Sequence, residues 1–307
     1  MKGFTHFVTG LAVTSFFPWA VQAAAEGNPF YFLLGGTCAL LPDTLDFRIL
    51  RYFYRHHIEV TPDPLCPDMQ MVADAIALAI DRAEQKKIRI RLNTIRSNVD
   101  TWQRYQIHID PRKQVLTASL EEAIDTGGNP VDGVSLSKQV ASAPFHTPVS
   151  LEYMATFSIE MFDGPHLECK PTPKGLVLIR FIPWHRAYTH SMGISTILAA
   201  AAVALGAWPA AIVGWSAHAS HVLLDQLGYM GSDLLWPLSH RRFPGFKLQH
   251  ASSSFWNLAA VWIAIAMLFS NIHSHAHTVH RLPPIGYIAA VIILPLAILH
   301  KWLSPAD

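Results

Sequence analysis

The chain has 307 residues, of which 51% are hydrophobic and 15% charged, with a formal net charge of +1. This composition is too apolar for a typical soluble enzyme and too polar for a protein made only of membrane helices, so it favours membrane helices interrupted by a soluble segment. The near-neutral charge argues against nucleic acid as a partner. The three cysteines, Cys38, Cys66 and Cys169, have no spacing that predicts a zinc knuckle or a disulfide framework.

Six apolar stretches are predicted to cross the membrane. A helix needs roughly 20 mostly apolar residues to cross the hydrocarbon core, or fewer where the bilayer thins around it. The stretches are residues 4–25, 29–41, two within 192–227, 255–270 and 285–302. The first stretch has an alternative interpretation as a cleavable secretory signal, because a lysine precedes the apolar run and small residues follow it.

Residues 59–180 have a different character. An amphipathic helix is predicted from the apolar residues on one of its faces, Val72, Ile76, Ile80 and Ala83. Strand-like alternation follows at residues 88–92 and again at 151–159. The predicted fold class is therefore mainly α, a polytopic membrane helix bundle of about six spans formed by residues 1–58 and 181–307. A soluble α+β insert, residues 59–180, lies between the second and third spans.

The orientation in the membrane follows from counting these spans. The count places the N-terminus, the insert and the C-terminus on one side, where the basic residues that flank the spans are concentrated, with Arg281 on the other side. The positive-inside rule makes the basic side cytoplasmic. We therefore expect an integral protein of a bacterial inner membrane, with both termini and the insert in the cytoplasm.

Four short motifs rich in ionisable residues fall on the predicted cytoplasmic side. They are Thr5-His6, Leu41-Pro42-Asp43-Thr44-Leu45-Asp46, His185-Arg186-Ala187-Tyr188-Thr189-His190-Ser191 and His221-Val222-Leu223-Leu224-Asp225. Ionisable groups at membrane depth are costly unless they are paired or bind an ion, so this clustering predicts a functional site.

The residue types and their spacing favour a divalent metal ion. His221 and Asp225, four positions apart, project from one face of a helix, and His218 on that face is expected to support a ligand rather than to be one. Pro42 is expected to end the second span and to start a new helix that carries Asp43 and Asp46 in its first turns. Imidazoles mixed with carboxylates favour Zn²⁺, with Mn²⁺ or Fe²⁺ as alternatives, and one or two ions. The candidate metal ligands are His6, Asp43, Asp46, His185, His190, His221 and Asp225.

The order of these motifs, followed by Leu234-Leu235-Trp236-Pro237, resembles the YdjM-like membrane-bound metal-dependent hydrolases. The resemblance covers about residues 1–50 and 183–240, and His-Arg-x-x-Thr-His-Ser is its most specific part. Many members read Asp-x-Asp where this chain has two aspartates three positions apart, which puts the role of Asp46 in doubt. The family is distantly similar to zinc-dependent phospholipase C and to certain nucleases, and this implies hydrolysis of a phosphoester by analogy.

The predicted function is a membrane-bound metal-dependent hydrolase of a phosphoester, with a phospholipid or lipid-linked substrate, at the cytoplasmic face. Asp46 is interpreted as a ligand or as the general base, and Arg186 as the residue that orients a phosphate or a ligating carboxylate and stabilises negative charge. One alternative is a divalent-metal transporter or sensor that also uses a second histidine cluster, at positions 273, 275, 277 and 280. Another is a scaffold in which the metal is structural.

Overall fold

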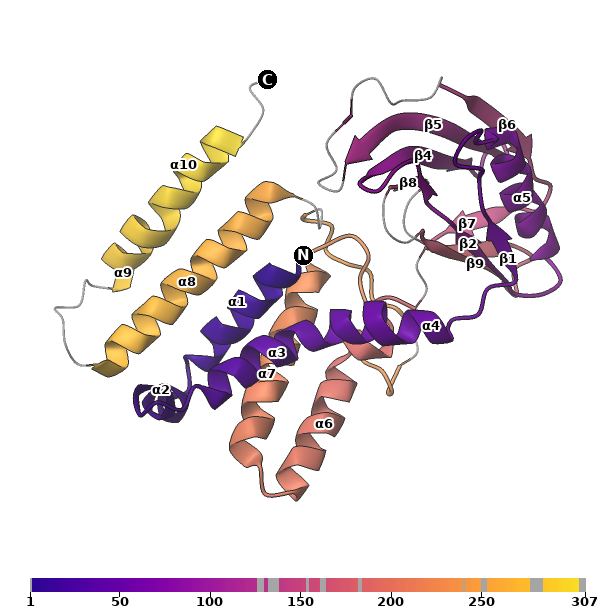
Figure 1. Ribbon diagram of the computed structural model, residues 1–307. Helices are drawn as coiled ribbons and strands as arrows, with labels where there is room; N and C mark the ends of the chain where they lie inside the picture. The colour runs from indigo at the N-terminus through magenta and orange to yellow at the C-terminus, as the bar shows by residue number, and fades with distance from the viewer. Residues whose placement is uncertain are drawn as a thin grey trace. The chain divides into compact units, whose positions relative to one another are not determined.

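The computed structural model describes residues 2–125, 130–131, 138–152, 155–160, 164–181, 184–239, 241–249, 253–276 and 284–303. Two of the histidines in the second predicted cluster, His277 and His280, lie outside these residues. The chain divides into two compact units, a helical unit of Met1–Arg51 with Trp184–Asp307 and a unit of Tyr52–Pro183 (Figure 1). Each unit is described by itself below.

The helical unit contains eight α-helices among its described residues. They are α1 (Gly3–Thr14), α2 (Pro18–Ala25), α3 (Phe30–Leu45), α6 (Met192–Ala204), α7 (Trp208–Gln226), α8 (Ser254–Ala276), α9 (Pro284–Tyr287) and α10 (Leu294–Leu303). The π-helical turn η1 (Asp46–Leu50) continues α3 and leads into the short helix α4 (Arg51–Phe53), the 3₁₀ turn η2 (Tyr188–His190) precedes α6, and a second π-helical turn, η3 (Ile288–Ile293), joins α9 to α10.

Helices α1, α3 and α7 pack against one another and form the centre of this unit (Figure 1). The crossing of α1 and α3 is close because both helices present glycine there. A β-carbon on Gly10 would lie 2.4 Å from the carbonyl oxygen of Gly35, which no real side chain tolerates. This crossing holds the first turns of α1, and with them His6, against the other two central helices.

The C-terminal helices lie on the outside of this centre. Helix α8 packs against α1, and α10 packs against α8 (Figure 1). The hydroxyl of Thr5 donates a buried hydrogen bond of 3.0 Å to Oδ1 of Asn257 on α8, and the side chain of Asn271 donates one of 2.9 Å to Ser15. Polar pairs of this kind fix the register between apolar helices.

The predicted bundle of six membrane spans is wrong. In the described parts of the chain one helix, Ser254–His275, is long and apolar enough to cross a membrane, and α1 with α2 would qualify as a pair that is bent by 98°. Helices α3 and α6 have 16 and 13 residues. At 1.5 Å per residue these lengths give about 24 and 20 Å, short of the roughly 30 Å hydrocarbon core.

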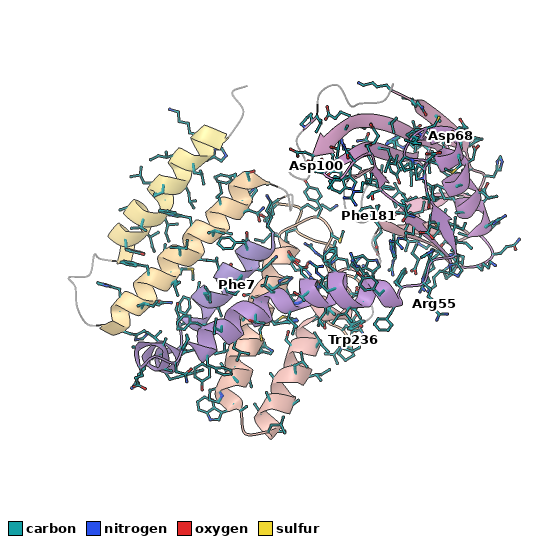
Figure 2. The ribbon with its side chains drawn as sticks, in the orientation of Figure 1. Phe7, Arg55, Asp68, Asp100, Phe181 and Trp236 are labelled. Carbon is teal, nitrogen blue, oxygen red and sulfur yellow. The ribbon has the colours of Figure 1, made fainter. Side chains whose placement is uncertain are left out.

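Among the described residues of the unit Tyr52–Pro183, one helix of more than three residues accompanies two five-stranded sheets. Its helix is α5 (Met69–Arg82), and Asp68, labelled in Figure 2, caps it by accepting hydrogen bonds from the backbone N–H groups of Gln70 and Met71. The predicted amphipathic helix is therefore confirmed, and its apolar face is buried. The fold of this unit is the α+β arrangement expected for the insert.

One sheet has the strand order β1-β2-β9-β10-β7, and the other has the order β3-β4-β5-β6 with β8 paired to β4. The strands of the first sheet are β1 (Ile58–Val60), β2 (Ile88–Leu92), β9 (His166–Pro171), β10 (Val177–Phe181) and β7 (Val149–Leu151). Those of the second are β3 (Ile95–Arg96), β4 (Thr101–Asp110), β5 (Val115–Asp125), β6 (Val140–Pro144) and β8 (Thr156–Ile159). The alternating stretch 151–159, predicted as one strand, thus supplies the end of β7 and all of β8, which lie in different sheets.

A nearly buried carboxylate joins three residues of this unit. Tyr54 donates its hydroxyl to Glu168 on β9, the Nε of Arg89 lies 3.2 Å from the same carboxylate, and the Nζ of Lys87 lies 3.5 Å from it. Burial tends to raise the pKa of Glu168, but the hydrogen bond from Tyr54 and the charges of Lys87 and Arg89 outweigh it and hold that pKa below its usual value.

We expect Glu168→Gln to lower the free energy of unfolding of this unit by roughly 1–3 kcal/mol at pH 7. A carboxyl whose pKa is depressed in the folded state stabilises above its unfolded pKa, and this stabilisation is lost as the pH falls through the folded pKa. The difference between Glu168→Gln and the parent should therefore shrink in acid. Hydrogen exchange of strands β2 and β9 across the pH range measures it, with the half-exposed Glu160 as the control position for a Gln substitution. A difference that does not change with pH would contradict this account.

Candidate metal centre

The predicted motifs meet in the helical unit. Asp43 projects from the last turn of α3, and His190 ends the 3₁₀ turn before α6. His221 and Asp225 lie one turn apart on α7, and His6 lies in the first turn of α1. Residues as far apart as 6 and 225 therefore line one buried region, because α1, α3 and α7 pack together there.

Pro42 does not start a new helix, contrary to the prediction. It lies inside α3, which continues to Leu45 and passes directly into the π-helical turn that begins at Asp46. Proline in a helix removes one backbone donor, and π-helical turns occur frequently at functional sites. Asp43 and Asp46 thus leave the chain from two different kinds of helix, and they contact different partners.

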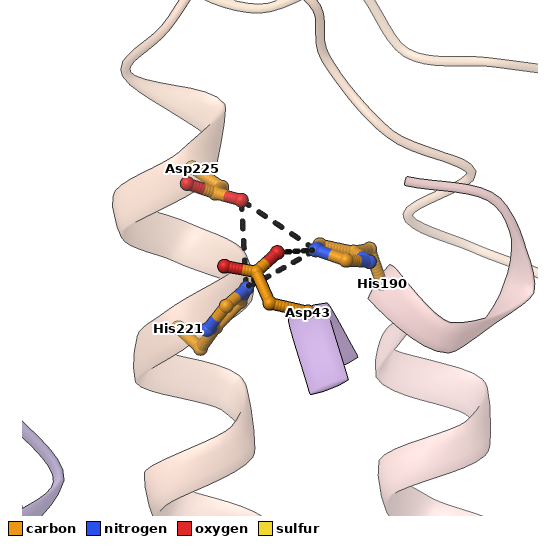
Figure 3. Close-up of side chains that lie close together, drawn as sticks. All are labelled: Asp43, His190, His221 and Asp225. Carbon is orange, nitrogen blue, oxygen red and sulfur yellow. Dashed lines mark hydrogen bonds and ion pairs between the residues drawn. The ribbon is translucent and has the colours of Figure 1, made fainter. Parts of the chain in front are cut away.

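Four side-chain atoms converge on one point, as Figure 3 shows. The Nε2 of His190 lies 3.1 Å from the Nε2 of His221 and 3.3 Å from an oxygen of Asp43. An oxygen of Asp225 lies 3.5 Å from the Nε2 of His221 and 3.6 Å from that of His190. The Nε2 of His221 and the oxygen of Asp43 are 3.8 Å apart. We call these four residues the His₂Asp₂ cluster.

The outer nitrogen of each imidazole faces an acceptor. The Nδ1 of His221 lies 2.6 Å from the carbonyl oxygen of Ala39, and the Nδ1 of His190 lies 3.2 Å from the carboxylate of Asp46. Because both partners only accept, each Nδ1 carries a hydrogen, and when the ring is neutral the lone pair of Nε2 points into the cluster. Two lone pairs and two carboxylate oxygens therefore face one another, and a cation is the partner that satisfies all four.

The spacing of the four atoms fits a tetrahedral ion. Zinc binds imidazole nitrogen and carboxylate oxygen at about 2.0–2.2 Å, so two ligands at the corners of a tetrahedron lie about 3.3–3.6 Å apart. The two Nε2 atoms lie 3.1 Å from each other and 3.3–3.8 Å from the two carboxylate oxygens. Buried Asp and His groups of this chain could therefore hold a metal ion.

Protonation of His190 competes with metal binding at the His₂Asp₂ cluster. His190 lies outside the candidate membrane-spanning helices. Burial tends to lower its pKa, but the carboxylates of Asp43 and Asp46 outweigh burial and raise the pKa of His190 to about 9. A cation at the His₂Asp₂ cluster therefore displaces a proton from His190 when it binds.

Asp46 supports His190 from behind. Its carboxylate accepts hydrogen bonds from the backbone N–H of Arg186 at 2.9 Å and from the hydroxyl of Thr189 at 2.5 Å. It also lies 3.0 Å from the Nδ1 of His185. Asp46, His185 and His190 form a second group with metal-ligand spacing. The donors around Asp46 already satisfy its charge, so its contacts favour orientation of His190 over direct ligation.

Arg186 holds Asp225 in place. Its guanidinium contacts an oxygen of Asp225 at 2.9 Å and the backbone carbonyl of the same residue at 3.1 Å, and it is almost fully buried. The backbone of Arg186 has a φ of 58°, in the left-handed region that costs energy for a residue with a side chain. Of the two roles predicted for Arg186, the structure supports orientation of a ligating carboxylate.

His6 completes the lining of the cluster. Its ring is fully buried and stacks on His221 with 3.8 Å between the ring centroids. Its Nε2 lies 3.4 Å from the Asp225 oxygen that Arg186 contacts, and neither ring nitrogen makes a hydrogen bond to any described residue. A buried imidazole without a hydrogen bond is costly, so His6 is well placed as a further ligand next to the His₂Asp₂ cluster.

Several supporting residues received no role in the sequence analysis. The hydroxyl of Ser191 caps α6 by accepting a hydrogen bond from the N–H of Ile194, and the hydroxyl of Thr189 donates one to Asp46. The positions of Thr189 and Ser191 within the His185–Ser191 motif could have suggested these contacts. The carbonyl of Ala39 orients His221, and no side-chain pattern reveals a backbone acceptor.

The Leu234–Pro237 motif contacts the loop that carries Arg186 and His190. The carbonyl of Leu234 accepts a hydrogen bond of 2.9 Å from the N–H of Met192, and Trp236, labelled in Figure 2, packs against Tyr188. Within the described residues, neither group with metal-ligand spacing includes His273 or His275 of the second predicted cluster. His218 donates to or accepts from Ser195 rather than joining the His₂Asp₂ cluster.

A model of the YdjM inner membrane protein family matches residues 149–306, just over half of the chain. The chain belongs to this family. Its environment is therefore a lipid bilayer, and the suspected family is confirmed. The match contains the His185–Ser191 and His221–Asp225 motifs and runs on through the C-terminal helices of this YdjM-family protein, whereas the resemblance was expected to end near residue 240. The N-terminal motifs, with His6, Asp43 and Asp46, lie before the matched residues. No curated protein and no solved structure matches the chain.

We expect substitutions to separate ligands from supporting residues. His221→Ala removes a lone pair from the cluster and should weaken metal binding by more than ~100-fold, because residues that only orient a ligand already account for about 10–100-fold. Asp46→Asn should fall within that smaller range and still bind metal at saturating concentration. Metal content and affinity of the purified full chain measure both effects.

The matched control is His108→Ala, at an exposed histidine on β4. Equal losses from His221→Ala and Asp46→Asn would place Asp46 in direct contact with the ion. Unchanged metal content in His221→Ala would show that the ion does not bind at the His₂Asp₂ cluster.

Proposed function

We propose that this YdjM-family protein is a metal-dependent hydrolase that cleaves a phosphoester at the cytoplasmic face of the membrane. The observation that supports this most strongly is the His₂Asp₂ cluster, in which two imidazole lone pairs and two carboxylates lie at tetrahedral spacing. Among common biological ions, zinc suits this mixture of nitrogen and oxygen ligands best, with manganese or iron as alternatives.

The unequal exposure of the four residues of the cluster gives the site a face for substrate. The side chain of Asp43 is 23% exposed, whereas those of His190, His221 and Asp225 are buried. Catalytic zinc sites have three protein ligands and keep the fourth position for water or substrate, so we assign His190, His221 and Asp225 as the ligands and place the open position beside Asp43. We propose a single ion, because the guanidinium of Arg186 contacts the other oxygen of Asp225, which a second cation would need as a ligand.

The residues in and around the cluster have different roles in the proposed reaction. A bound divalent cation supplies Lewis-acid activation of the phosphoryl oxygen and of a water. Asp46 keeps His190 oriented and Arg186 keeps Asp225 oriented, so the ligands are held rigidly. Asp43, the exposed carboxylate, is the group in reach of an incoming water, and we assign it the role of accepting that water's proton in place of Asp46.

A membrane setting favours a lipid or lipid-linked phosphoester as substrate. The family is one of inner membrane proteins, so the environment of this chain is a lipid bilayer. A substrate that already resides in the bilayer reaches such a site by lateral diffusion, with its phosphate at the level of the headgroups.

A structural metal is the second candidate. The His₂Asp₂ cluster supplies four protein ligands, and closed tetrahedral sites with four protein ligands are typical of structural zinc. Under this alternative Asp43 stays bound to the ion, and the helical unit is a scaffold that the metal stabilises.

Hydrolysis distinguishes the two candidates. We expect the full chain with zinc to cleave phosphoester or phospholipid substrates, and Asp43→Asn to lower kcat/KM by roughly 100-fold or more through loss of the proton acceptor. Chelation should abolish turnover, and added zinc should restore it. Asp110→Asn on β4 is the matched control. Bound metal without turnover on any of these substrates would favour the structural alternative.

The orientation in the membrane has its own test. Cys66 is exposed in the insert, whereas Cys169 is buried. If the insert is cytoplasmic, a membrane-impermeant maleimide should label Cys66 only after the inner membrane of spheroplasts is permeabilised. Labelling of Cys66 in intact spheroplasts would reverse the predicted orientation.

A further inference from the structure

An apolar pocket of about 190 Å³ lies between α3, α6 and α7. Leu34, Cys38 and Leu41 line it from α3, and residues from Ala210 to His218 line it from α7. On the α6 side its wall is built mainly from alanine and leucine, with Ser195 at one end. Small side chains on packed helices leave space that larger side chains would fill, so the alanines of the lining are the reason that the pocket exists.

The polar end of the pocket adjoins the His₂Asp₂ cluster. Leu41 precedes Asp43 by two residues, and His218 lies one turn before His221 on α7. Ser195, which bonds His218, lies about one turn after His190. The three segments that supply metal ligands therefore continue directly into the walls of the pocket.

The pocket also has the length and polarity of a chain-binding site. Its lining extends over residues 34–41 of α3 and 210–218 of α7, which is about 10–12 Å along a helix at 1.5 Å per residue. Apart from Ser195, His218 and Cys38 its lining is apolar, and His218 and Ser195 lie at the end near the cluster. Ligand pockets typically combine an apolar wall with a few polar groups at one end.

We propose that this pocket holds the hydrocarbon chain of a lipid substrate whose phosphate headgroup is bound at the His₂Asp₂ cluster. This inference rests on the proposed function, because the cation at the cluster is what attracts the phosphate. The substrate class is then an amphiphile with a phosphoester head and an alkyl or acyl chain, as opposed to a small soluble phosphate ester. A phosphoryl oxygen at a bound cation and an apolar tail in an apolar pocket satisfy both ends of such a molecule at once.

Cys38 reports occupancy of the pocket without any need for turnover. In full-length protein carrying Cys66→Ser, loaded with zinc and solubilised in a detergent without phosphate, N-ethylmaleimide modifies Cys38, and mass spectrometry follows the rate. We expect octyl phosphate to slow this modification by about tenfold when nine-tenths of the sites are occupied, because only the unoccupied fraction reacts. Inorganic phosphate should leave the rate unchanged. Leu198→Cys, at a half-exposed position of the lining, gives the same readout if Cys38 reacts too slowly.

A pair of neighbouring alanines on α6 provides the matched variants. Ala199 lines the pocket, whereas Ala200 is exposed on the same helix and does not line it. Ala199→Phe should fill the pocket and abolish protection by octyl phosphate, and Ala200→Phe should preserve it. Both variants should keep the metal content of the parent, which verifies that they fold.

The outcomes separate this inference from the proposed function. Protection of the reporter cysteine without hydrolysis of any phosphoester would support the pocket and overturn the hydrolase. Hydrolysis of soluble phosphoesters without protection by octyl phosphate, or equal protection by octanol and octyl phosphate, would overturn the pocket's link to the headgroup. Protection that survives in Ala199→Phe would place the chain elsewhere.

Discussion

The hydrogen bonds on the outer nitrogens of His190 and His221 are the interaction on which the site depends. Each Nδ1 faces an acceptor, the carboxylate of Asp46 in one case and the carbonyl of Ala39 in the other, so each Nε2 lone pair is directed at Asp43 and Asp225. When both imidazoles are neutral, the four groups are all acceptors and repel one another unless a cation lies between them. The supporting contacts therefore decide the chemistry of the centre as much as the ligands themselves do.

This arrangement requires helices that approach closely and a loop held under constraint. The glycine crossing of α1 and α3 brings His6 against His221, and the left-handed backbone of Arg186 lets its N–H bind Asp46 while its side chain reaches Asp225. Strain of this kind persists where surrounding contacts compensate for it, which is common at functional sites. Of the helices next to the cluster, α3 and α6 are too short to span a bilayer, and α8 is the clearest candidate for a span among the described helices.

Features that depend on local chemistry were predictable from the sequence, and those that depend on packing were not. Histidine and aspartate are costly in an apolar chain unless they are paired or bind an ion, so their clustering predicted the site. The helix from Met69 to Arg82 was predictable from its apolar period. The six spans were wrong because hydropathy does not reveal where a helix ends: α3 has 16 residues and α6 has 13, and α7 carries the buried polar residues His218, His221 and Asp225.

By itself the sequence determined the family, the types of ligand and the motifs that carry them, because these depend on which residues are present and in what order. Only the tertiary structure decided which of Asp43 and Asp46 faces the cluster, since three positions of separation say nothing about the change from α-helix to π-helical turn between them. It likewise assigned Arg186 to Asp225 and Ala39 to His221. Those pairings join residues more than 35 positions apart, and packing, which no local pattern encodes, brings them into contact.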